Sequence, residues 1–264
     1  GVAMFGASAE SAMELARDPA APAEALAQLA EKLEMIGPFN GGLREALKAE
    51  HRIACNIVDE LYAKHEQRAL TAYLGFNTNK WVTQLLNTRY SFKPNRTKLD
   101  LAAVHRFAIN NVSQIYADMN EFDVANKEEG RWSILRPNKI GNYLFLLLMP
   151  SDTIVEARCR TDGILAGAKL VVACHRFERD KGRWPESLVE LVPNYLSEVP
   201  QDPYDGAPFR YSAEKGLVWA VGKNLTDEGG STRVLGVEEA STASRNRPKA
   251  EDFVFELRAA EKAK

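Results

Sequence analysis

Residues 175–211 read HRFERDKGRWPESLVELVPNYLSEVPQDPYDGAPFRY, and this stretch decides the fold. Its first residues close a long apolar helix, and Gly182 stands where a helix C′ residue is expected. Pro185 then favours the start of a short helix over residues 186–192. Further prolines and the Asp205–Gly206 pair impose an extended path with tight turns. The chain therefore changes from helical to extended structure just after Gly182.

The residues after this stretch predict a small antiparallel sheet. Two short strands are expected at 209–212 and 217–221, joined by a hairpin turn at 213–216. A loop rich in Gly and Asp follows at 222–230. A last strand is expected at 252–257, where Phe253 and Phe255 alternate with Val254 and Glu256.

The segment before residue 182 predicts one long helix, 153–181, which we call the spine. Its apolar residues form two adjacent stripes, so we expect it to pack on two sides. The run Ala166-Gly167-Ala168 would allow another element to approach the spine backbone closely. Phe177 closes one stripe a turn before Gly182, and we expect it to be buried where the spine meets the sheet.

The first 150 residues read as helices in series. Helices are expected at 11–17, 23–36, 43–70, 78–88, 99–119 and 139–149, with Thr97 as the N-cap of the fifth. Residues 120–138 are polar and form the longest expected loop. The predicted fold class is α+β, with a helical region at 1–150 and the spine plus a small sheet domain at 151–264.

The C-terminal third resembles the soluble domain of the major pseudopilin of bacterial type II secretion systems. The shared features are a helix that ends in Gly-Arg-aromatic-Pro, an Asp-Pro-aromatic-x-Gly turn and a Pro-aromatic-x-Tyr strand. They stand at 182–185, 202–206 and 208–211, and a late loop at 221–230 is similar too. The resemblance implies a pseudopilin-type sheet, an N-terminal anchoring helix and a calcium site in the late loop.

The late loop departs from the family at its metal site. Asn224 and Asp227 are the candidate calcium ligands, since both supply hard oxygen atoms. Arg233 stands close by in the sequence and would oppose a cation. We therefore expect a loop held by turn hydrogen bonds, without calcium and without any other cofactor.

Composition limits the partners of this chain. It has 264 residues, 45% of them hydrophobic, and a net charge of −2, which argues against binding to nucleic acid. The best apolar run, 143–149, is far shorter than the ~20 residues that span a bilayer. The chain opens Gly1-Val2-Ala3-Met4, and we expect that an N-terminal anchor has been trimmed away. Protein partners and an extracytoplasmic, membrane-anchored location follow from the resemblance.

Residues with reactive side chains form no recognisable catalytic motif. The sequence after His65 lacks the second histidine of a zinc protease, and the sequence around Ser8 lacks the last glycine of a nucleophile elbow. Cys55, Cys159 and Cys174 fit no metal spacing, and buried thiols, one disulfide or a reactive thiol all stay open.

Three functions are compatible with the sequence. The first is a non-enzymatic interaction or assembly protein linked to secretion or envelope structure. The second is a ligand-binding module with a pocket between the helices and the C-terminal sheet. The third is a hydrolase that uses acidic residues.

Overall fold

The computed structural model describes residues 2–63, 91–119, 138–150, 153–231 and 252–258. Helices and one three-stranded antiparallel sheet make up this part of the chain, which confirms the α+β class. The chain divides into two compact units. Unit 1 is Gly1–Phe39, Ile115–Met119 and Val155–Lys264, and unit 2 is Asn40–Gln114 and Asn120–Ile154. None of the described helices is long and apolar enough to cross a membrane.

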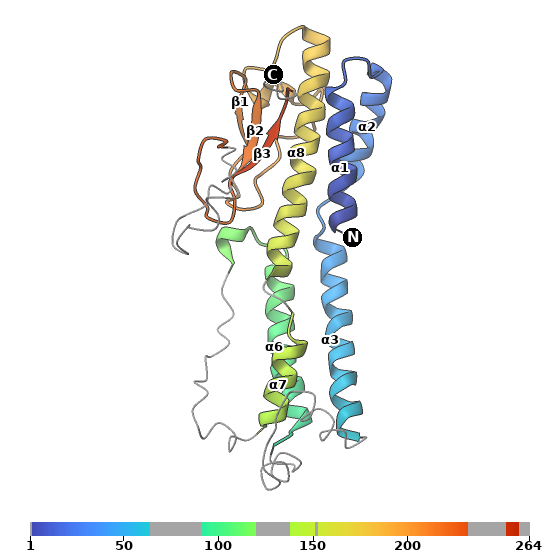
Figure 1. Ribbon diagram of the computed structural model, residues 1–264, viewed down its shortest axis with the longest axis vertical. Helices are drawn as coiled ribbons and strands as arrows, with labels where there is room; N and C mark the ends of the chain where they lie inside the picture. The colour runs from blue at the N-terminus through green and yellow to red at the C-terminus, as the bar shows by residue number, and fades with distance from the viewer. Residues whose placement is uncertain (1, 64–90, 120–137, 151–152, 232–251, 259–264) are drawn as a thin grey trace, which may run out of the picture. The chain divides into compact units, whose positions relative to one another are not determined.

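Unit 1 is built around the long helix α8 (Thr153–Lys181), which confirms the predicted spine. Six successive residues, from Leu170 to His175, are buried, and six residues cover every direction around a helix. Figure 1 shows why, because the sheet lies on one side of α8 and helices α1 and α2 lie on another. The helix ends at Gly182, whose φ of +71° and N–H bond to the Glu178 carbonyl make it the C′ residue.

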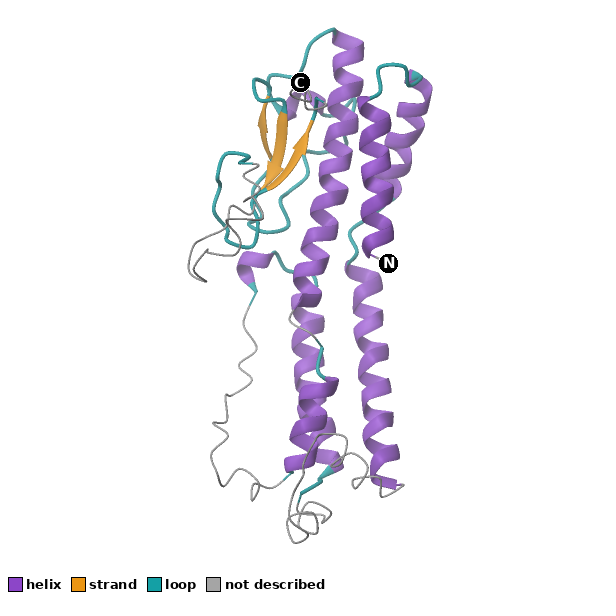
Figure 2. Ribbon diagram, viewed as in Figure 1, coloured by secondary structure: helices purple, strands orange, loops and turns teal. Residues whose placement is uncertain are grey.

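The sheet of unit 1 has the three predicted strands, each within one residue of the expected bounds. Strands β1 (Arg210–Ser212), β2 (Leu217–Ala220) and β3 (Phe253–Glu256) pair in sequence order, all antiparallel (Figure 2). Val218 of β2 lies opposite Phe255 of β3, and both are buried in the core that also contains the α8 residues. The predicted short helix is shorter than expected, a 3-10 turn η3 (Leu188–Leu191), because the backbone of Ser187 is extended, with φ −148° and ψ 157°.

Close approach at Gly167 joins the sheet to α8. A Cβ atom at this glycine would lie 2.4 Å from the ring of Phe255, so the ring sits directly against the helix backbone. The imidazole of His175 adds a hydrogen bond of 2.8 Å to the Leu257 carbonyl just after β3. The predicted role of the small residues in the spine is thereby confirmed.

Helices α1 (Val2–Arg17) and α2 (Ala23–Met35) belong to unit 1, although the sequence placed them with the other N-terminal helices. Arg179 of α8 donates to the carbonyls of Ala21 and Asp18 at 2.6 and 2.7 Å, between the two helices. Arg17 donates to the Glu256 carbonyl of β3 at 2.7 Å. The expected single boundary at residue 150 therefore differs from the compact units, because these long-range bonds tie the first helices to α8 and the sheet.

Unit 2 consists of helices α3 (Asn40–Ala63), α6 (Pro94–Asn111) and α7 (Lys139–Leu148) in its described part. Among the described residues of this unit, one apolar cluster contains the buried side chains of Ala54, Val58, Phe92, Leu101, Ile140 and Leu144. The predicted helix at 78–88 and residues 120–137 of the predicted loop lie outside the described residues.

The prediction for Thr97 is wrong. Helix α6 begins at Pro94, whose fixed φ suits the first helical turn, so Thr97 lies inside the helix. The amide oxygen of Asn138 accepts the Lys93 N–H at 2.7 Å instead, and Thr97 is buried beside it.

The same helix was expected to continue to residue 119, but it ends at Asn111. The chain then forms a 3-10 turn, η1 (Tyr116–Asp118), in unit 1. The N–H groups of Tyr116 and Ala117 bond to the carbonyls of Pro203 and Tyr204, at 3.0 and 2.8 Å. These long-range bonds take the place of helical ones, which a local pattern cannot reveal.

Candidate functional site

The Asp-Pro-aromatic-x-Gly turn and the strand after it form a network of buried charge around Asp202. This side chain has no exposed surface, and its oxygens accept the N–H groups of Tyr204 and Val221 at 2.8 and 2.7 Å. Arg210 of β1 donates to the same carboxylate at 2.6 Å and pairs with Asp205 as well. The network locks the turn against strands β1 and β2.

Burial and Arg210 shift the pKa values of the two carboxylates in this network. Burial raises the pKa of Asp202 to about 6, although the two backbone N–H groups and Arg210 favour its charged form. Burial works in the same direction on Asp205, but the Arg210 guanidinium and the Ala207 N–H together outweigh it and hold that pKa below its usual value. A raised carboxylate pKa can mark an acid catalyst. Here the carboxylate is wholly enclosed and bonded, so its shift supports a structural role.

Asp227, a candidate calcium ligand, is engaged with donors from the protein. One oxygen accepts Trp219 Nε1 and the Gly229 N–H, both at 2.9 Å, and the other lies 3.6 Å from Nε of Arg210. The hydrogen bond from Trp219, with Gly229 and Arg210, lowers the pKa of Asp227. A cation at this carboxylate would have to compete with the guanidinium.

Asn224, the second candidate, is bonded within the same loop. Its amide nitrogen donates to Glu228 at 2.9 Å and its oxygen accepts the Thr226 N–H at 3.1 Å. Thus the oxygens of both candidates already accept hydrogen bonds from the protein. Among the residues that the structure describes, no three or more His, Cys, Asp or Glu side chains are grouped for a metal ion. Arg233 lies outside those residues, and the expectation about calcium stays a prediction.

Asp252 is a residue of this loop region that the sequence did not single out. Its carboxylate accepts the N–H groups of Glu228 and Gly230 at 3.1 and 3.0 Å and so ties the start of the last strand to the late loop. Burial raises its pKa, and the charges of Glu228 and Asp227 add to that effect. The one sequence feature that could have indicated this role is the position of Asp252 next to the last strand, because its bonding partners are more than twenty residues away.

The three cysteines are free thiols. Cys159 and Cys174 are buried, and burial raises their pKa values to about 11 and about 12. Both therefore stay protonated at neutral pH, which fits the interpretation as small hydrophobic residues. Cys55 is half-buried on α3 of unit 2.

Two of the histidines are buried, and they differ in their partners. His175 bonds to the Leu257 carbonyl and meets the ring of Trp184 edge-on, and burial lowers its pKa to about 4. His105 of α6 bonds to the Leu101 carbonyl through Nδ1 at 2.8 Å, while its Nε2 has no hydrogen-bond partner among the described residues. His51 of α3 lies next to it, with the ring centroids 5.0 Å apart.

Comparison with protein-family models, with curated proteins and with solved structures finds no significant match to this chain.

Proposed function

We propose that this chain is a non-enzymatic interaction or assembly protein of the bacterial cell envelope, built on a pseudopilin-like C-terminal domain. One observation carries the proposal. The residues that resemble the pseudopilin motif hold the helix, the turns and the sheet of unit 1 together. Their side chains bond to one another and to the backbone of unit 1.

Each part of the motif has an internal structural task. Gly182 ends α8 with its positive φ, and the carbonyl of Pro185 accepts the hydroxyl of Tyr211 at 2.8 Å. Asp202 fastens the following turn to Arg210 and to the backbone of Val221. Side chains that are committed to the scaffold in this way supply an interaction module rather than a catalytic centre.

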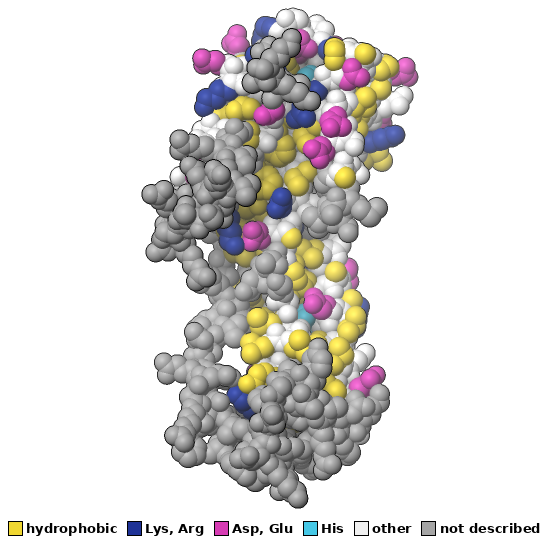
Figure 3. Space-filling view, viewed as in Figure 1, with side chains coloured by type: hydrophobic (Ala, Val, Ile, Leu, Met, Phe, Trp, Pro, Cys, Tyr) yellow, Lys and Arg dark blue, Asp and Glu magenta, His cyan; other side chains and the backbone are white. Residues whose placement is uncertain are grey.

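The surface of unit 2 supports an interaction role. The three helices of its described part leave several large apolar side chains open to solvent, namely Ile53, Ile57, Leu99, Leu146 and Leu147. In Figure 3 hydrophobic side chains are visible over the helices of this unit. Exposed apolar surface of this kind is typical of protein-binding regions.

Assembly through a bare spine helix does not fit this chain. In unit 1, α8 is covered by the sheet and by α1 and α2, which share one core with it. We therefore propose association with protein partners through other surfaces, with membrane attachment through an N-terminal anchor and no cofactor.

Location is tested by labelling intact cells that produce the chain in its natural length. Met35, which is 81% exposed, is replaced by Cys in a Cys55→Ser background and treated with a membrane-impermeant maleimide. Cysteine at Ala168, which is fully buried, is the matched control that reacts only after unfolding. Reaction of the Met35→Cys protein before lysis is expected. Reaction only after lysis would contradict an extracytoplasmic location.

Association is tested in the same cells with a photo-crosslinking residue placed at Leu147, and at Ala30 as a buried control. A cross-link from Leu147 to an identified secretion or envelope protein is expected, with none from Ala30. A chain that forms no cross-link from Leu147, Ile53 or Leu99 would contradict the interaction role.

A further inference from the structure

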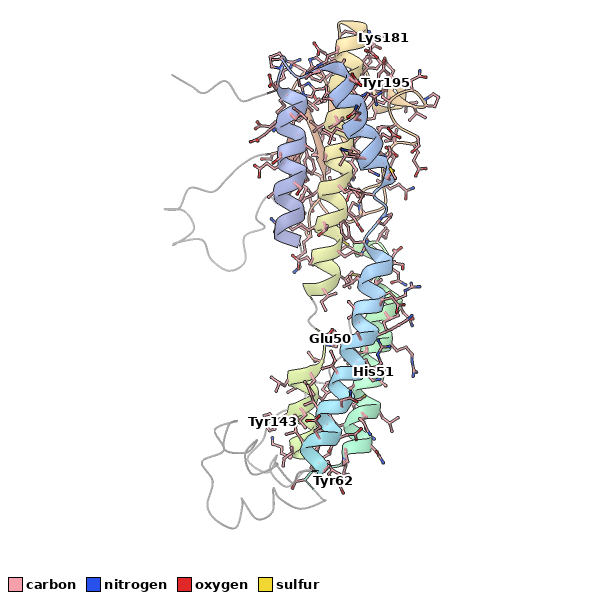
Figure 4. The ribbon with its side chains drawn as sticks, turned by 90° about the vertical axis from the view of Figure 1, so that its right-hand side faces the viewer. Glu50, His51, Tyr62, Tyr143, Lys181 and Tyr195 are labelled. Carbon is pink, nitrogen blue, oxygen red and sulfur yellow. The ribbon has the colours of Figure 1, made fainter. Side chains whose placement is uncertain are left out.

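Two histidines meet where α3 packs along α6 in unit 2. The ring centroids of His51 and His105 lie 5.0 Å apart, with 50° between the ring planes. His105 is 1% exposed, whereas His51 is half-buried. Figure 4 shows His51 on α3 with α6 beside it, and both residues belong to unit 2. The contact of the two rings is thus part of the α3–α6 interface.

The surroundings of His105 suit a neutral ring and oppose a charged one. Its Nδ1 donates to the Leu101 carbonyl at 2.8 Å, which leaves a lone pair on Nε2. Nε2 is buried and has no hydrogen-bond partner among the described residues, His51 included. A second proton on this ring would therefore be a buried donor without an acceptor, and it would bring a charge into the helix interface.

The thiol of Cys55 faces His51 from the same helix and does not compensate a positive charge. Its Sγ lies 3.7 Å from His51 Nε2. Burial raises the pKa of Cys55, so the thiol keeps its proton at neutral and acidic pH. It supplies no anion to a charged imidazole.

The charged side chains of the three helices are exposed or have other partners. Four that stand near the two histidines in the sequence are exposed, namely Lys48, Glu50, Arg52 and Arg106. Lys98 of α6 pairs with Asp59 of α3 at 2.7 Å. Lys139, the one charged residue of α7, lies over the Tyr143 ring. In the described part of the chain, none of these groups forms an ion pair with either imidazole.

We propose that the contact of His51 with His105 is a pH-sensitive device, which holds α3 against α6 while both rings are neutral and weakens this interface at mildly acidic pH. It acts in the packing that the structure shows and needs no further ligand. The proposal is independent of the assembly function.

The sign of the pH dependence follows from burial. Burial and, to a smaller extent, the neighbouring His105 lower the pKa of His51, so the unfolded chain takes up the proton first as the pH falls. The stability that the contact contributes is complete above about pH 6.5, the ordinary histidine pKa, and is lost as the pH falls below it. A histidine that stays neutral in the folded state lowers the folding equilibrium constant about tenfold between pH 7.5 and 5.5.

Hydrogen exchange of the full chain at pH 7.5 and 5.5, corrected for the intrinsic exchange rate at each pH, tests the device. Protection of the backbone amides of α3 and α6 should fall about 10- to 100-fold between the two pH values, for one or both rings. His175→Gln, a change at a buried histidine of unit 1, is the matched control and should leave this fall intact.

The double variant His51→Gln, His105→Asn removes both titrating rings, and the asparagine amide can still donate to the Leu101 carbonyl. Its protection in α3 and α6 should change less than about twofold between the two pH values, because no histidine titrates at the interface. His51 is only half-buried, so His51→Gln alone gives the test if the double variant fails to fold, and it should make the fall smaller.

Two results would overturn the proposal. One is a fall in protection that is the same in His51→Gln as in the wild type. The other is wild-type protection in α3 and α6 that stays constant or rises at pH 5.5, which would show that the folded interface accepts the proton, with His51 donating it to Nε2 of His105.

Discussion

Units 1 and 2 each have a helix glycine that allows a side chain from elsewhere in the chain to contact the helix backbone. The two side chains differ in polarity. In unit 1 the apolar ring of Phe255 lies against Gly167 of α8. In unit 2 a Cβ on Gly141 of α7 would lie 2.0 Å from Thr97 Oγ1 and 2.2 Å from Asn138 Oδ1, which are polar atoms. At these two positions, an apolar ring lies against the helix backbone in unit 1, whereas hydrogen-bonded polar side chains lie against it in unit 2.

The difference agrees with the sizes of the two cores. Unit 1 buries a large continuous cluster that extends from α1 through α8 to β3. In the described part of unit 2, the main cluster contains six buried residues, and large apolar side chains are exposed on α3, α6 and α7. We therefore expect unit 1 to resist unfolding more strongly than unit 2.

Loss of the Phe177 ring should have the largest effect. This side chain is 4% exposed, as the sequence predicted, and meets the Tyr195 ring at 5.4 Å between centroids. Phe177→Ala should lower the free energy of unfolding by ~3–5 kcal/mol, because it leaves a cavity in the core of unit 1. Urea unfolding measures the change. A loss below about 1 kcal/mol would mean that this core does not dominate the stability of unit 1.

Acid should weaken unit 1 through His175. Its pKa is lowered to about 4 by burial, so the unfolded state, with an ordinary pKa of 6.5, takes up a proton first as the pH falls. Stability is complete above pH 6.5 and is lost between pH 6.5 and 4, by at most about 3 kcal/mol. Asp202 acts in the opposite direction, because its pKa is raised to about 6 and its protonation favours the folded state.

The pH effect is isolated by comparing the wild type with His175→Gln in urea melts at several pH values. The difference in free energy of unfolding between the two proteins should shrink as the pH falls from 6.5 to 4. A difference that stays constant across this range would show that His175 does not titrate as its burial requires.

Alanine at the two glycines compares the units directly. Gly167→Ala and Gly141→Ala should each cost about 1–3 kcal/mol, because the new methyl groups overlap Phe255 and Thr97 respectively. Thr97→Ser combined with Gly141→Ala should not restore stability, since the hydroxyl that is overlapped remains. Phe255→Leu with Gly167→Ala should restore part of it, since the flat ring is removed. Equal behaviour of the two double mutants would remove the distinction between apolar and polar contacts.

Calcium should have no effect on the stability of the chain. The Asp227 carboxylate is engaged with Trp219, Gly229 and Arg210, so saturating calcium should leave the melting temperature unchanged. Asp227→Ala should lower stability by at most about 1 kcal/mol, since the side chain is half-exposed. A clear rise of the melting temperature with calcium that Asp227→Ala abolishes would show that the pseudopilin-like metal site is retained.

Local patterns in the sequence were sufficient to predict the long helix and the strands that follow residue 153. Gly182, the prolines after it and the alternating strand residues depend on backbone geometry, which neighbouring residues settle. The length of α8, its two-sided burial and the close approach at Gly167 followed from helical spacing for the same reason. The α+β class and the antiparallel sheet were therefore predictable from the amino-acid sequence alone.

Only the tertiary structure decided which distant groups meet. Bonds between residues far apart in the chain decided three features. They end α6 at Asn111, place α1 and α2 beside α8, and let Asn138 accept the N–H at the start of α6. The contact between the rings of His51 on α3 and His105 on α6 also joins residues of different helices. Helical periodicity determines which side of a helix is apolar. It does not determine which neighbour that side will face, because the neighbour is selected by packing across the whole chain.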